Sequence, residues 1–550
     1  MRCLKVFLGL GALGLAPSVA EAQVPQILFR DGDPIIGVGG MDKVDYVEVL
    51  DSGTWLAFIE ADISDNNTDR CLMRNGFLTL REGMNIPVPT GAVLDDWGSV
   101  DMAENGNLGM VIKLRIGTAP SDGLYWNLRL LARGGDILNV PPLSPTTTLA
   151  SVLVVRITAD GTILALMKVR NPAVNPNRDV DALFRYRVDA QGNLLQRELL
   201  ATKDATNDTL GVPVDTLGTV TTPEHSMEMN RRGDFILPVS GLGRRAMMKN
   251  LDTILAEELL ESPVPGRTWN GNAFSLSKVA INDRGDTVFT GTLTPIGPAT
   301  EPTNFLIVKN GLKFAQSGDV IPALSTATLA KSTPKLAISN RGDVFWRAQP
   351  TAGTAGGSAF MINHTPLMQE AVTVVEGNLV MTVPGGDDCF AISPEGRFFL
   401  GRVTLQSVGD AVLYIDFGLV TELPGCAGNP GRLQHLSGAS RIGQQLRIGM
   451  DDGPHPGALP VLFFSRSSGL NAAGCGAATT LGELMLAPPF SDFFLLPAWD
   501  GVNPSVFTVT VPNNMALVDA TFYMQGLFGN ASQPNSFKLT NGLKYEIGPP

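Results

Sequence analysis

The sequence predicts an all-β protein, a seven-bladed β-propeller followed by a C-terminal antiparallel β-sandwich. Two observations carry this prediction. Turn-forming residues are abundant, with 60 Gly and 38 Pro among 550 residues, which is typical of many short strands joined by tight turns. A glycine-centred motif also recurs at nearly constant spacing, which is the signature of a propeller or an array of sheets. The chain is too long for one core, so at least two domains are expected.

The first 22 residues have the pattern of a secretory signal peptide. Arg2 and Lys5 precede an apolar run, and Ala20 and Ala22 form the small-residue pattern of a cleavage site. We therefore expect cleavage after Ala22 and a secreted or cell-surface protein. The alternative, a membrane anchor, is disfavoured because the apolar run is short and contains Pro17.

The charge of the chain limits its partners. The formal net charge is −12 and no basic cluster is present, which argues against nucleic acid because phosphates require a basic face. No later stretch offers the roughly 18 consecutive apolar residues of a membrane span, so no transmembrane segment is expected. We expect the mature chain to be a monomer.

Seven segments share an apolar pair, a polar turn that ends in glycine, and an apolar strand. Residues 281–289 (INDRGDTVF) and 338–346 (ISNRGDVFW) show the pattern clearly. The seven turn glycines are Gly53, Gly106, Gly161, Gly233, Gly285, Gly342 and Gly396. Successive differences between these numbers are 53, 55, 72, 52, 57 and 54, so one module recurs through the predicted propeller at residues 23–425. The long interval is expected to hold an extended loop and a hairpin at residues 170–195.

Each module is expected to form four strands, with a tight turn between the first two and an Asn-Gly turn between the last two. Gly285 is expected in the left-handed conformation that a type I turn with a bulge requires. The side chain of Asn282 can bond back to the turn backbone, which favours Asn, Asp or Ser at this position. Residues 310–322 (NGLKFAQSGDVIP) illustrate the second hairpin.

Three of the seven turns contain Arg-Gly-Asp, the tripeptide associated with cell-adhesion ligands. They lie at residues 232–234, 284–286 and 341–343, and the residues flanking the glycine vary in the other four turns. An adhesion ligand normally protrudes on a mobile loop tip, whereas these turns are expected to be held by their own sheets. We interpret the tripeptide as a by-product of turn formation.

The N-terminal segment 27–35 matches the last strand of a module but has no earlier strands of its own. It is expected to pair with the seventh module and close a ring, and residues 418–425 are a second candidate for that closing strand. Cys71 lies in the first module and Cys389 in the seventh, so ring closure would allow a Cys71–Cys389 disulfide. In a linear β-array, the rival architecture, these modules would lie far apart.

The period ends near Gly425, and residues 426–550 contain alternating strands such as 505–512 (SVFTVTVP). This alternation predicts the antiparallel β-sandwich. Cys426 and Cys475 are candidates for a disulfide within it, as expected for a small, even set of cysteines in an exported chain. We expect a surface or sorting role for this module, so that its removal would change where residues 23–425 accumulate.

The turns resemble those of a bacterial secreted family of tandem repeats with the pattern N-x-x-G-x-x-x-F. Asn282, Gly285 and Phe289 match the pattern fully, the modules of Gly233 and Gly342 depart conservatively, and the other four lack the Asn. The C-terminal part resembles a β-rich module at the end of many secreted bacterial proteins. Together the resemblance covers most of the mature chain. It implies a propeller-like fold with a β-rich C-terminal module, and it implies no catalytic residue.

No motif predicts a catalytic residue or a cofactor. The chain has no G-x-S-x-G nucleophile turn and no zincin, P-loop or dinucleotide-binding motif. One loop concentrates hard oxygen ligands that suit Ca²⁺: Asp62, Asp65, Asn67 and Asp69. It lacks the glycine and the distal Glu of an EF-hand, so a solvated hairpin loop is the alternative interpretation.

Two functions follow from this pattern. The first is a non-enzymatic binding or scaffold protein that uses a propeller face to recognise an extracellular glycan or protein. It is favoured because the architecture carries no catalytic motif. The alternative is a carbohydrate-active hydrolase or lyase with carboxylates at the propeller funnel. A cluster of Asp or Glu, Arg and Tyr that converges on one end of the channel would favour this alternative.

Overall fold

The computed structural model shows an all-β chain, and no α-helix occurs among its described residues. No helix in this part of the chain is long and apolar enough to cross a lipid bilayer. The predicted signal peptide at residues 1–22 lies outside the described residues. These are residues 25–547 without 66–67, 172–177, 219–225, 275–276, 296–303, 322–323, 325–327, 332–334, 352–356, 387, 418, 424, 427–428, 438–439, 441, 444, 452–457, 472–473, 497, 500–504, 518–519 and 531–532.

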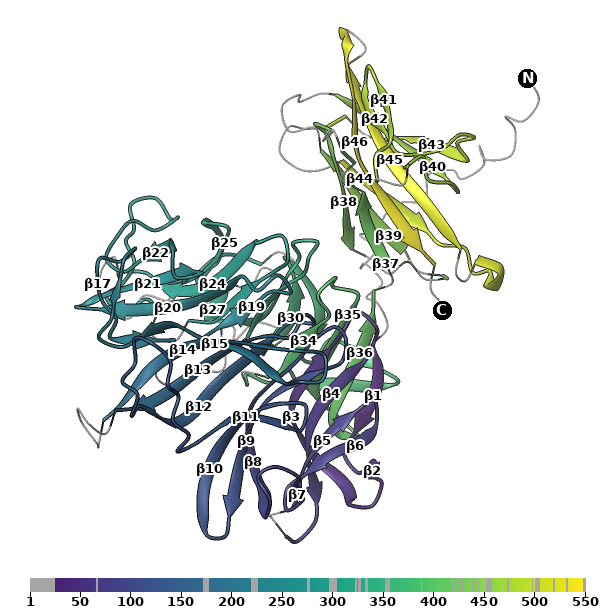
Figure 1. The fold of residues 1–550 in the computed structure, drawn as a ribbon. Helices are drawn as coiled ribbons and strands as arrows, with labels where there is room; N and C mark the ends of the chain where they lie inside the picture. Colours follow the sequence, from purple (N-terminus) through teal and green to yellow (C-terminus); the bar gives the residue numbers. More distant parts are fainter. Residues whose placement is uncertain are drawn as a thin grey trace. The chain divides into compact units, whose positions relative to one another are not determined.

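The chain forms two compact units, an N-terminal unit at Pro25–Asp416 and a C-terminal unit that begins at Phe417. In the N-terminal unit, seven sheets of the described residues each have four to six strands (Figure 1). We number them sheet 1 to sheet 7, in the order in which the turn glycines occur along the chain.

The strands of the first three sheets follow one another directly in sequence. Sheet 1 has the order β2 (Pro34–Ile35), β3 (Gly39–Val49), β4 (Trp55–Asp62), β5 (Arg70–Arg74) and β6 (Phe77–Arg81). Sheet 2 has the order β7 (Asn85–Ile86), β8 (Ala92–Met102), β9 (Leu108–Ile116), β10 (Ala119–Trp126) and β11 (Arg129–Arg133). Sheet 3 has the order β12 (Thr148–Ile157), β13 (Thr162–Arg170), β14 (Asp179–Val188) and β15 (Leu194–Thr202).

The next three sheets repeat this meander, after an extra hairpin of β16 (Thr206–Asn207) and β17 (Val212–Pro213). Sheet 4 consists of β18 (Thr216–Leu217), β19 (Glu228–Met229), β20 (Phe235–Gly241), β21 (Arg244–Lys249) and β22 (Thr253–Glu257). Sheet 5 consists of β23 (Val279–Ile281), β24 (Thr287–Thr292), β25 (Phe305–Lys309) and β26 (Leu312–Gln316). Sheet 6 consists of β27 (Leu329–Lys331), β28 (Leu336–Ile338), β29 (Val344–Pro350), β30 (Ala359–Ile362) and β31 (Thr365–Gln369).

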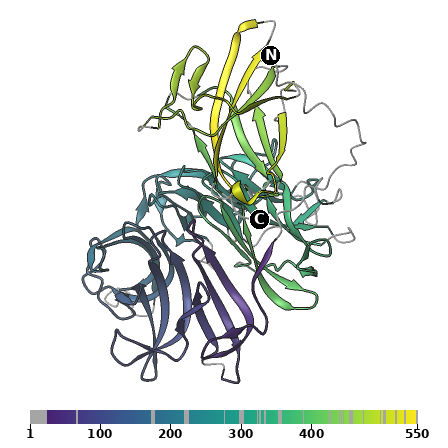
Figure 2. The same ribbon diagram turned by 90° about the vertical axis from the view of Figure 1, so that its right-hand side faces the viewer.

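Sheet 7 joins the two ends of the N-terminal unit. It consists of β32 (Val374–Val375), β33 (Asn378–Thr382), β34 (Phe390–Ile392), β35 (Phe398–Leu405), β36 (Gly409–Asp416) and β1 (Gln26–Arg30). Strand β1 pairs antiparallel with β36, with Gln26 opposite Tyr414, so the expected pairing of the N-terminal segment with the seventh module is confirmed. The purple N-terminal strands lie beside green strands of sheet 7 (Figure 1, Figure 2).

Successive sheets of the N-terminal unit share hydrophobic cores. Phe58 of sheet 1 packs on Trp97 of sheet 2 with ring centroids 5.2 Å apart, and further cores join sheets 2 to 3, 3 to 4, 4 to 5 and 5 to 6. Phe360 of sheet 6 contacts Phe399 of sheet 7 at 5.5 Å. A final core contains buried residues of both sheet 7 and sheet 1. Each sheet is therefore covered on both faces, which explains why its strands are apolar on both faces.

The turn between the first two long strands of each module forms as the sequence predicts. Gly285 has φ +83°, and the other six turn glycines also have positive φ. The Oδ1 atom of Asn282 accepts hydrogen bonds from the backbone N–H groups of Arg284 (3.1 Å) and Asp286 (2.9 Å), as expected. Its Nδ2 group donates to the carbonyl of Ser339 in the next sheet at 2.8 Å, and Asn230 donates to Asn282 in the same way. The Asn of the repeat pattern therefore ties neighbouring modules together.

We expect Asn282→Ala to lower the free energy of unfolding of the N-terminal unit by about 2 kcal/mol or more, because buried groups lose their partners. Asn282→Ser, which copies Ser339 of the next module, should cost less, since a hydroxyl still accepts from the turn as Ser339 Oγ does from Asp343 N at 3.2 Å. Urea unfolding of the three proteins measures both effects. Equal stability of Asn282→Ala and the parent protein would contradict this role.

The aspartates of the Arg-Gly-Asp turns are bound inside their own sheets. Asp286 Oδ1 accepts from Asn310 Nδ2 at 2.8 Å, and Asn310 Oδ1 accepts from the backbone N–H of Thr287 at 2.8 Å. The same pair recurs in the two other turns as Asp234 with Asn250 and Asp343 with Asn363. The carboxylates thus fasten each tight turn to the Asn turn of the next hairpin, which supports the structural interpretation of the tripeptide.

The C-terminal unit contains three sheets among its described residues. One has the order β37 (Leu419–Leu423), β46 (Gln533–Glu546), β45 (Thr521–Asn530), β40 (Leu459–Ser465) and β43 (Asp492–Leu495). A second has the order β38 (Arg432–Ser437), β39 (Gln445–Asp451) and β44 (Ser505–Thr510), and a third pairs β41 (Ala477–Thr479) with β42 (Gly482–Leu484). A short 3-10 helix, η4, spans Met515–Leu517. Buried residues of the first two sheets share one hydrophobic core.

The boundary between the units lies earlier than the sequence predicts. The repeat period predicts a boundary after Gly425, but the compact units divide between Asp416 and Phe417. The reason is that strand β37 pairs with β46, with Leu419 opposite Glu546, and so belongs to the C-terminal unit. Within the predicted segment 418–425, strand β37 therefore does not supply the closing strand of sheet 7.

Candidate active site

A cavity of about 340 Å³ lies in the N-terminal unit and is lined by residues from all seven sheets. In each sheet, the residue five positions before the turn glycine lines this cavity. We call these seven residues the cavity ring: Glu48, Asp101, Arg156, Glu228, Ala280, Ala337 and Ala391. A cavity of this size is within the range of small-molecule sites.

The cavity ring is chemically asymmetric. Sheets 1 to 4 contribute charged side chains, whereas sheets 5 to 7 contribute alanine at the equivalent position. The small alanine side chains leave room beside the charged groups. The ring therefore has a polar half that can form hydrogen bonds and an apolar half that can contact carbon atoms of a ligand.

Glu48 connects sheet 1 to sheet 2. Its Oε1 atom accepts a hydrogen bond from the backbone N–H of Met102 at 2.8 Å. The Tyr46 hydroxyl lies 2.8 Å from Glu48 Oε2 and 3.2 Å from the carbonyl oxygen of Val100. The hydroxyl donates to Glu48, and this hydrogen bond, like that from Met102, lowers the pKa of Glu48 and so opposes the effect of burial.

Asp101 and Arg156 continue the polar half of the ring. Asp101 Oδ2 accepts from the backbone N–H of Ile157 at 2.6 Å. Arg156 Nε donates to Glu228 Oε2 at 3.3 Å, and Arg156 Nη1 donates to the carbonyl of Val155 at 2.8 Å. Each charged group thus bonds to the neighbouring sheet or to its own strand, which holds it in a fixed position toward the cavity.

The two carboxyl groups differ in their proton affinity. Burial raises the pKa of Glu48 to about 8, and the nearby charge of Asp101 acts in the same direction. Burial raises the pKa of Asp101 to about 6, against the opposing effect of Arg156. Both side chains are half-buried, since they are surrounded by protein but keep accessible surface along the cavity. The environment therefore favours the protonated form of Glu48 more strongly than that of Asp101.

Two lysines also line the cavity, seven positions before their turn glycines. Lys335 Nζ lies 5.8 Å from the ring centroids of both Tyr46 and Phe390, and its charge lowers the pKa of Glu48 without reversing the effect of burial. Lys278 is buried at the equivalent position of sheet 5. Carboxyl, guanidinium, ammonium and phenol groups therefore converge on one cavity.

Arg231, in the turn of sheet 4, lines the cavity at the level of the turns. Its guanidinium pairs with carboxylates from four other sheets. Nη2 lies 2.6 Å from Glu395 Oε1, and Nη1 lies 3.3 Å from Asp51 Oδ2 and 3.7 Å from Glu104 Oε1. Nε pairs with Asp283. All three guanidinium nitrogens are engaged.

The predicted Ca²⁺ ligands lie on the loop between β4 and β5. Asp62 ends β4, Asp65 Oδ2 accepts from Thr68 Oγ1 at 3.0 Å, and the carbonyl of Asp69 accepts from the backbone N–H of Ala61 at 2.9 Å. Asn67 lies outside the described residues. The Ca²⁺ site stays a prediction.

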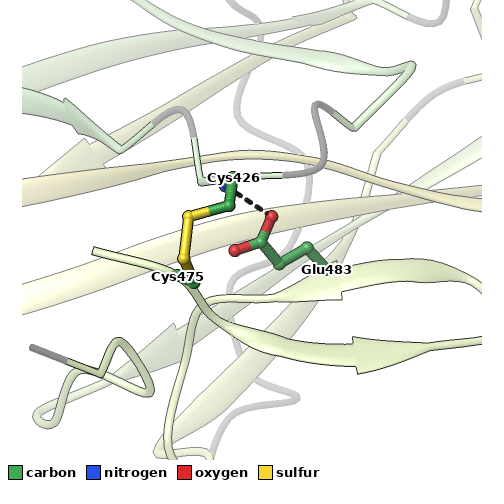
Figure 3. A group of neighbouring side chains, drawn as sticks. All are labelled: Cys426, Cys475 and Glu483. Carbon is green, nitrogen blue, oxygen red and sulfur yellow. Dashed lines mark hydrogen bonds between the residues drawn. A yellow bond between two sulfur atoms is a disulfide. The ribbon is translucent and has the colours of Figure 1, made fainter. Parts of the chain in front are cut away.

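A group of Cys426, Cys475 and Glu483 in the C-terminal unit has ligand atoms within 4.8 Å of one another, but it is not a metal centre as it stands. The two cysteines form the predicted disulfide, with an S–S distance of 1.92 Å. Glu483 Oε2 accepts from the backbone N–H of Cys426 at 2.7 Å (Figure 3). The carboxylate therefore orders the segment that carries the disulfide.

The disulfide considered between Cys71 and Cys389 is not formed. Both are free thiols with no exposed surface. Cys71 is a core residue of β5, and its Sγ lies 3.8 Å from the carbonyl of Asp69 in its own sheet. Burial raises the pKa of the Cys71 thiol to about 11 and that of the Cys389 thiol to about 12, so both stay protonated and unreactive at neutral pH.

Sequence motifs identify none of the residues of the cavity ring as functional. A signal was nevertheless present in the register of the repeats. When the modules are aligned on their turn glycines, one apolar-flanked position is charged in sheets 1 to 4 and alanine in sheets 5 to 7. Charge at a strand position between apolar neighbours indicates a polar interior surface.

No family model matches the chain, and no curated protein matches it. Solved structures with some likeness include an alpha-L-arabinanase of Penicillium chrysogenum (11% identity, TM-score 0.27, 72% of this chain and 98% of that chain). Another is an exo-beta-1,3-galactanase of Phanerochaete chrysosporium (9%, 0.23, 94% and 100%). A third is Drosophila Semaphorin 1a, extracellular domains 1-2 (8%, 0.27, 71% and 88%). At these TM-scores the likeness supports no conclusion, so the functional argument rests on the residues of this chain.

Proposed function

We propose that this protein is a secreted glycoside hydrolase whose N-terminal unit is a seven-bladed β-propeller and whose active site is the cavity ring. One observation carries the proposal: Glu48 and Asp101 line the same cavity, and burial raises the pKa of both carboxyl groups, that of Glu48 further. Pairs of carboxyl groups with separated pKa values are the acid and base of glycoside hydrolysis. The convergence of carboxyl, Arg and Tyr groups is the feature that favours hydrolysis over a non-enzymatic scaffold.

The seven-bladed arrangement is supported by the order of the shared cores. Each of the seven sheets packs against the next, and sheet 7 shares a core with sheet 1 while β1 completes sheet 7. Sheets stacked in this order around a common cavity are the arrangement of a propeller, and its central channel is a usual place for a site.

In the proposed reaction, protonated Glu48 gives its proton to the glycosidic oxygen as the bond between that oxygen and the anomeric carbon breaks. The Asp101 carboxylate stabilises the positive charge that develops on the sugar. Water adds its hydroxyl to the anomeric carbon and its remaining proton to the carboxyl pair, which restores Glu48. Arg156 and Lys335 are placed to bind sugar hydroxyl groups.

The experiment that tests this function uses the exported mature protein and a panel of nitrophenyl glycosides and polysaccharides at pH 7. Chromatography of the products should show a reducing sugar released from at least one substrate class. If no substrate of the panel releases a reducing sugar, the proposal is wrong. Saturable binding of a substrate without such release would support the non-enzymatic scaffold interpretation instead.

The rate of hydrolysis should follow a bell-shaped pH profile with its maximum near pH 7. Below the Asp101 pKa of about 6 the carboxylate is protonated, and above the Glu48 pKa of about 8 the acid has lost its proton, so the rate falls on both sides. Measuring kcat/KM between pH 4 and pH 10, values chosen to span roughly two units beyond each pKa, checks this profile. Glu198→Gln, which changes an exposed carboxylate of β15, should leave both limbs in place.

A further inference from the structure

Arg231 forms ion pairs with residues of sheets that are not adjacent to its own sheet. It belongs to sheet 4, whereas its carboxylate partners belong to sheets 1, 2, 5 and 7. Several hydrogen bonds of the cavity wall run instead between adjacent sheets, as for Glu48 with Met102 and Asp101 with Ile157. Partners in sheets 1 and 7 require the guanidinium to reach across the cavity rather than along its wall.

The surrounding turns are tied to one another and to Arg231. Asn340 Nδ2 donates to Glu395 Oε1 at 2.8 Å and to Asp283 Oδ2 at 2.6 Å. The backbone N–H of Glu395 donates to Asp51 Oδ1 at 2.8 Å. The backbone N–H of Arg231 itself donates to Asp283 Oδ1 at 2.8 Å. Arg231 is thus the centre of a connected network at the turn end of the cavity.

We infer that Arg231 closes the turn end of the cavity and makes the enzyme act on chain ends, so that Arg231 is a specificity-determining residue. This inference rests on the proposed hydrolase function. A sugar chain cannot pass through a cavity that is blocked at one end. Only a terminal unit can then occupy the space between the carboxyl pair and Arg231.

The positions of these residues along the chain support this limit. Glu48 lies in β3, which ends at Val49, and Asp51 lies three residues after Glu48 in the turn that follows. Asp101 and Glu104 have the same spacing in sheet 2. A sugar chain that continued past the carboxyl pair would therefore meet the Arg231 network.

The opposite end of the cavity provides the entrance. Its lining includes Asp45, Arg70 and Asp388. Arg70 Nη2 lies 3.4 Å from Asp45 Oδ2 in sheet 1, and Arg70 also pairs with Asp96 in the adjacent sheet 2. These ion pairs run along the wall between two neighbouring sheets and do not reach across the cavity as those of Arg231 do, so we take this end as the entrance. The substrate therefore enters with its terminal unit first.

The test compares products of the parent protein with those of Arg231→Ala and Arg231→Lys, on the polysaccharide that the substrate panel identifies. The parent should release terminal units from the first minutes, without a ladder of longer fragments. Arg231→Ala should raise the share of longer fragments at least tenfold. Arg231→Lys, whose single nitrogen cannot hold four carboxylates, should give an intermediate share and serves as the milder variant if Arg231→Ala fails to fold.

Arg232→Ala is the matched control, since Arg232 occupies the same turn but does not line the cavity. It should keep the product pattern of the parent. A structural role alone would lower all products equally and leave their ratio unchanged, which would overturn the inference. A ladder of fragments from the parent protein would overturn it too and leave the hydrolase function standing, whereas no release by any protein would overturn both.

Discussion

Glu48→Gln should lower kcat for glycoside hydrolysis by about 10²–10⁴-fold, because the amide cannot supply the proton that the leaving oxygen requires. The substitution preserves the local hydrogen bonds. The amide oxygen can accept from the backbone N–H of Met102, and the amide nitrogen can donate to the Tyr46 oxygen, whose hydroxyl can then donate to the carbonyl of Val100. Initial rates on the best substrate of the panel, measured at pH 7, determine the size of the loss.

The fold of this variant should be intact, since a neutral amide replaces a carboxyl that burial keeps neutral at this pH. Thermal unfolding of the N-terminal unit should therefore be close to that of the parent protein. Glu198→Gln is the matched exposed control and should retain full activity. Unchanged activity of Glu48→Gln, or a loss explained by unfolding, would remove Glu48 from the proposed mechanism.

Removing the disulfide with Cys426→Ser and Cys475→Ser together should destabilise the C-terminal unit by about 4 kcal/mol. The expected size follows from the entropy of closing a loop with a sequence separation of 49 in the unfolded chain. Guanidinium unfolding should show an earlier transition for the C-terminal unit alone, because both cysteines belong to that unit.

Reduction of the parent protein with a thiol reagent should produce the same shift. Cys71 and Cys389 are free, so reduction changes no bond in the N-terminal unit. Cys71→Ser provides the comparison, as it affects the other unit. A shift in both transitions after the double substitution, or in neither, would contradict the assignment of the disulfide to the stability of one unit.

The fold could be predicted to a large extent because its main signals are local. Each tight turn needs a glycine with positive φ, and the turns alone reveal the number and spacing of the modules. The pairing of the N-terminal segment could also be predicted from its similarity to other last strands. The boundary between the units could not be predicted, because β37 pairs with β46, which lies at the far end of the C-terminal unit in sequence. The local sequence of such a short strand is the same whether it pairs with the seventh module or with the C-terminal unit. The surface or sorting role of that unit stays a prediction.

The candidate site could be predicted less well, because strands β3 and β8 are irregular. Their pairing registers shift between Val44 and Tyr46 and between Trp97 and Val100. A shift of one residue reverses the face on which every following side chain lies, so alternation in the sequence does not place Glu48 or Asp101 in an interior. Contacts across the cavity, such as those of Arg231, join residues far apart in sequence and leave no local pattern.

The pairing of Gln26 with Tyr414 also determines where the N-terminal unit is most easily opened. Joining these two ends costs about 5 kcal/mol in loop-closure entropy, by the logarithmic dependence on the number of intervening residues. Other neighbouring sheets are joined through short connections and carry no comparable cost. We therefore expect reversible opening of the native unit to begin where β1 pairs with β36 within sheet 7, because the separated strands regain the most freedom there.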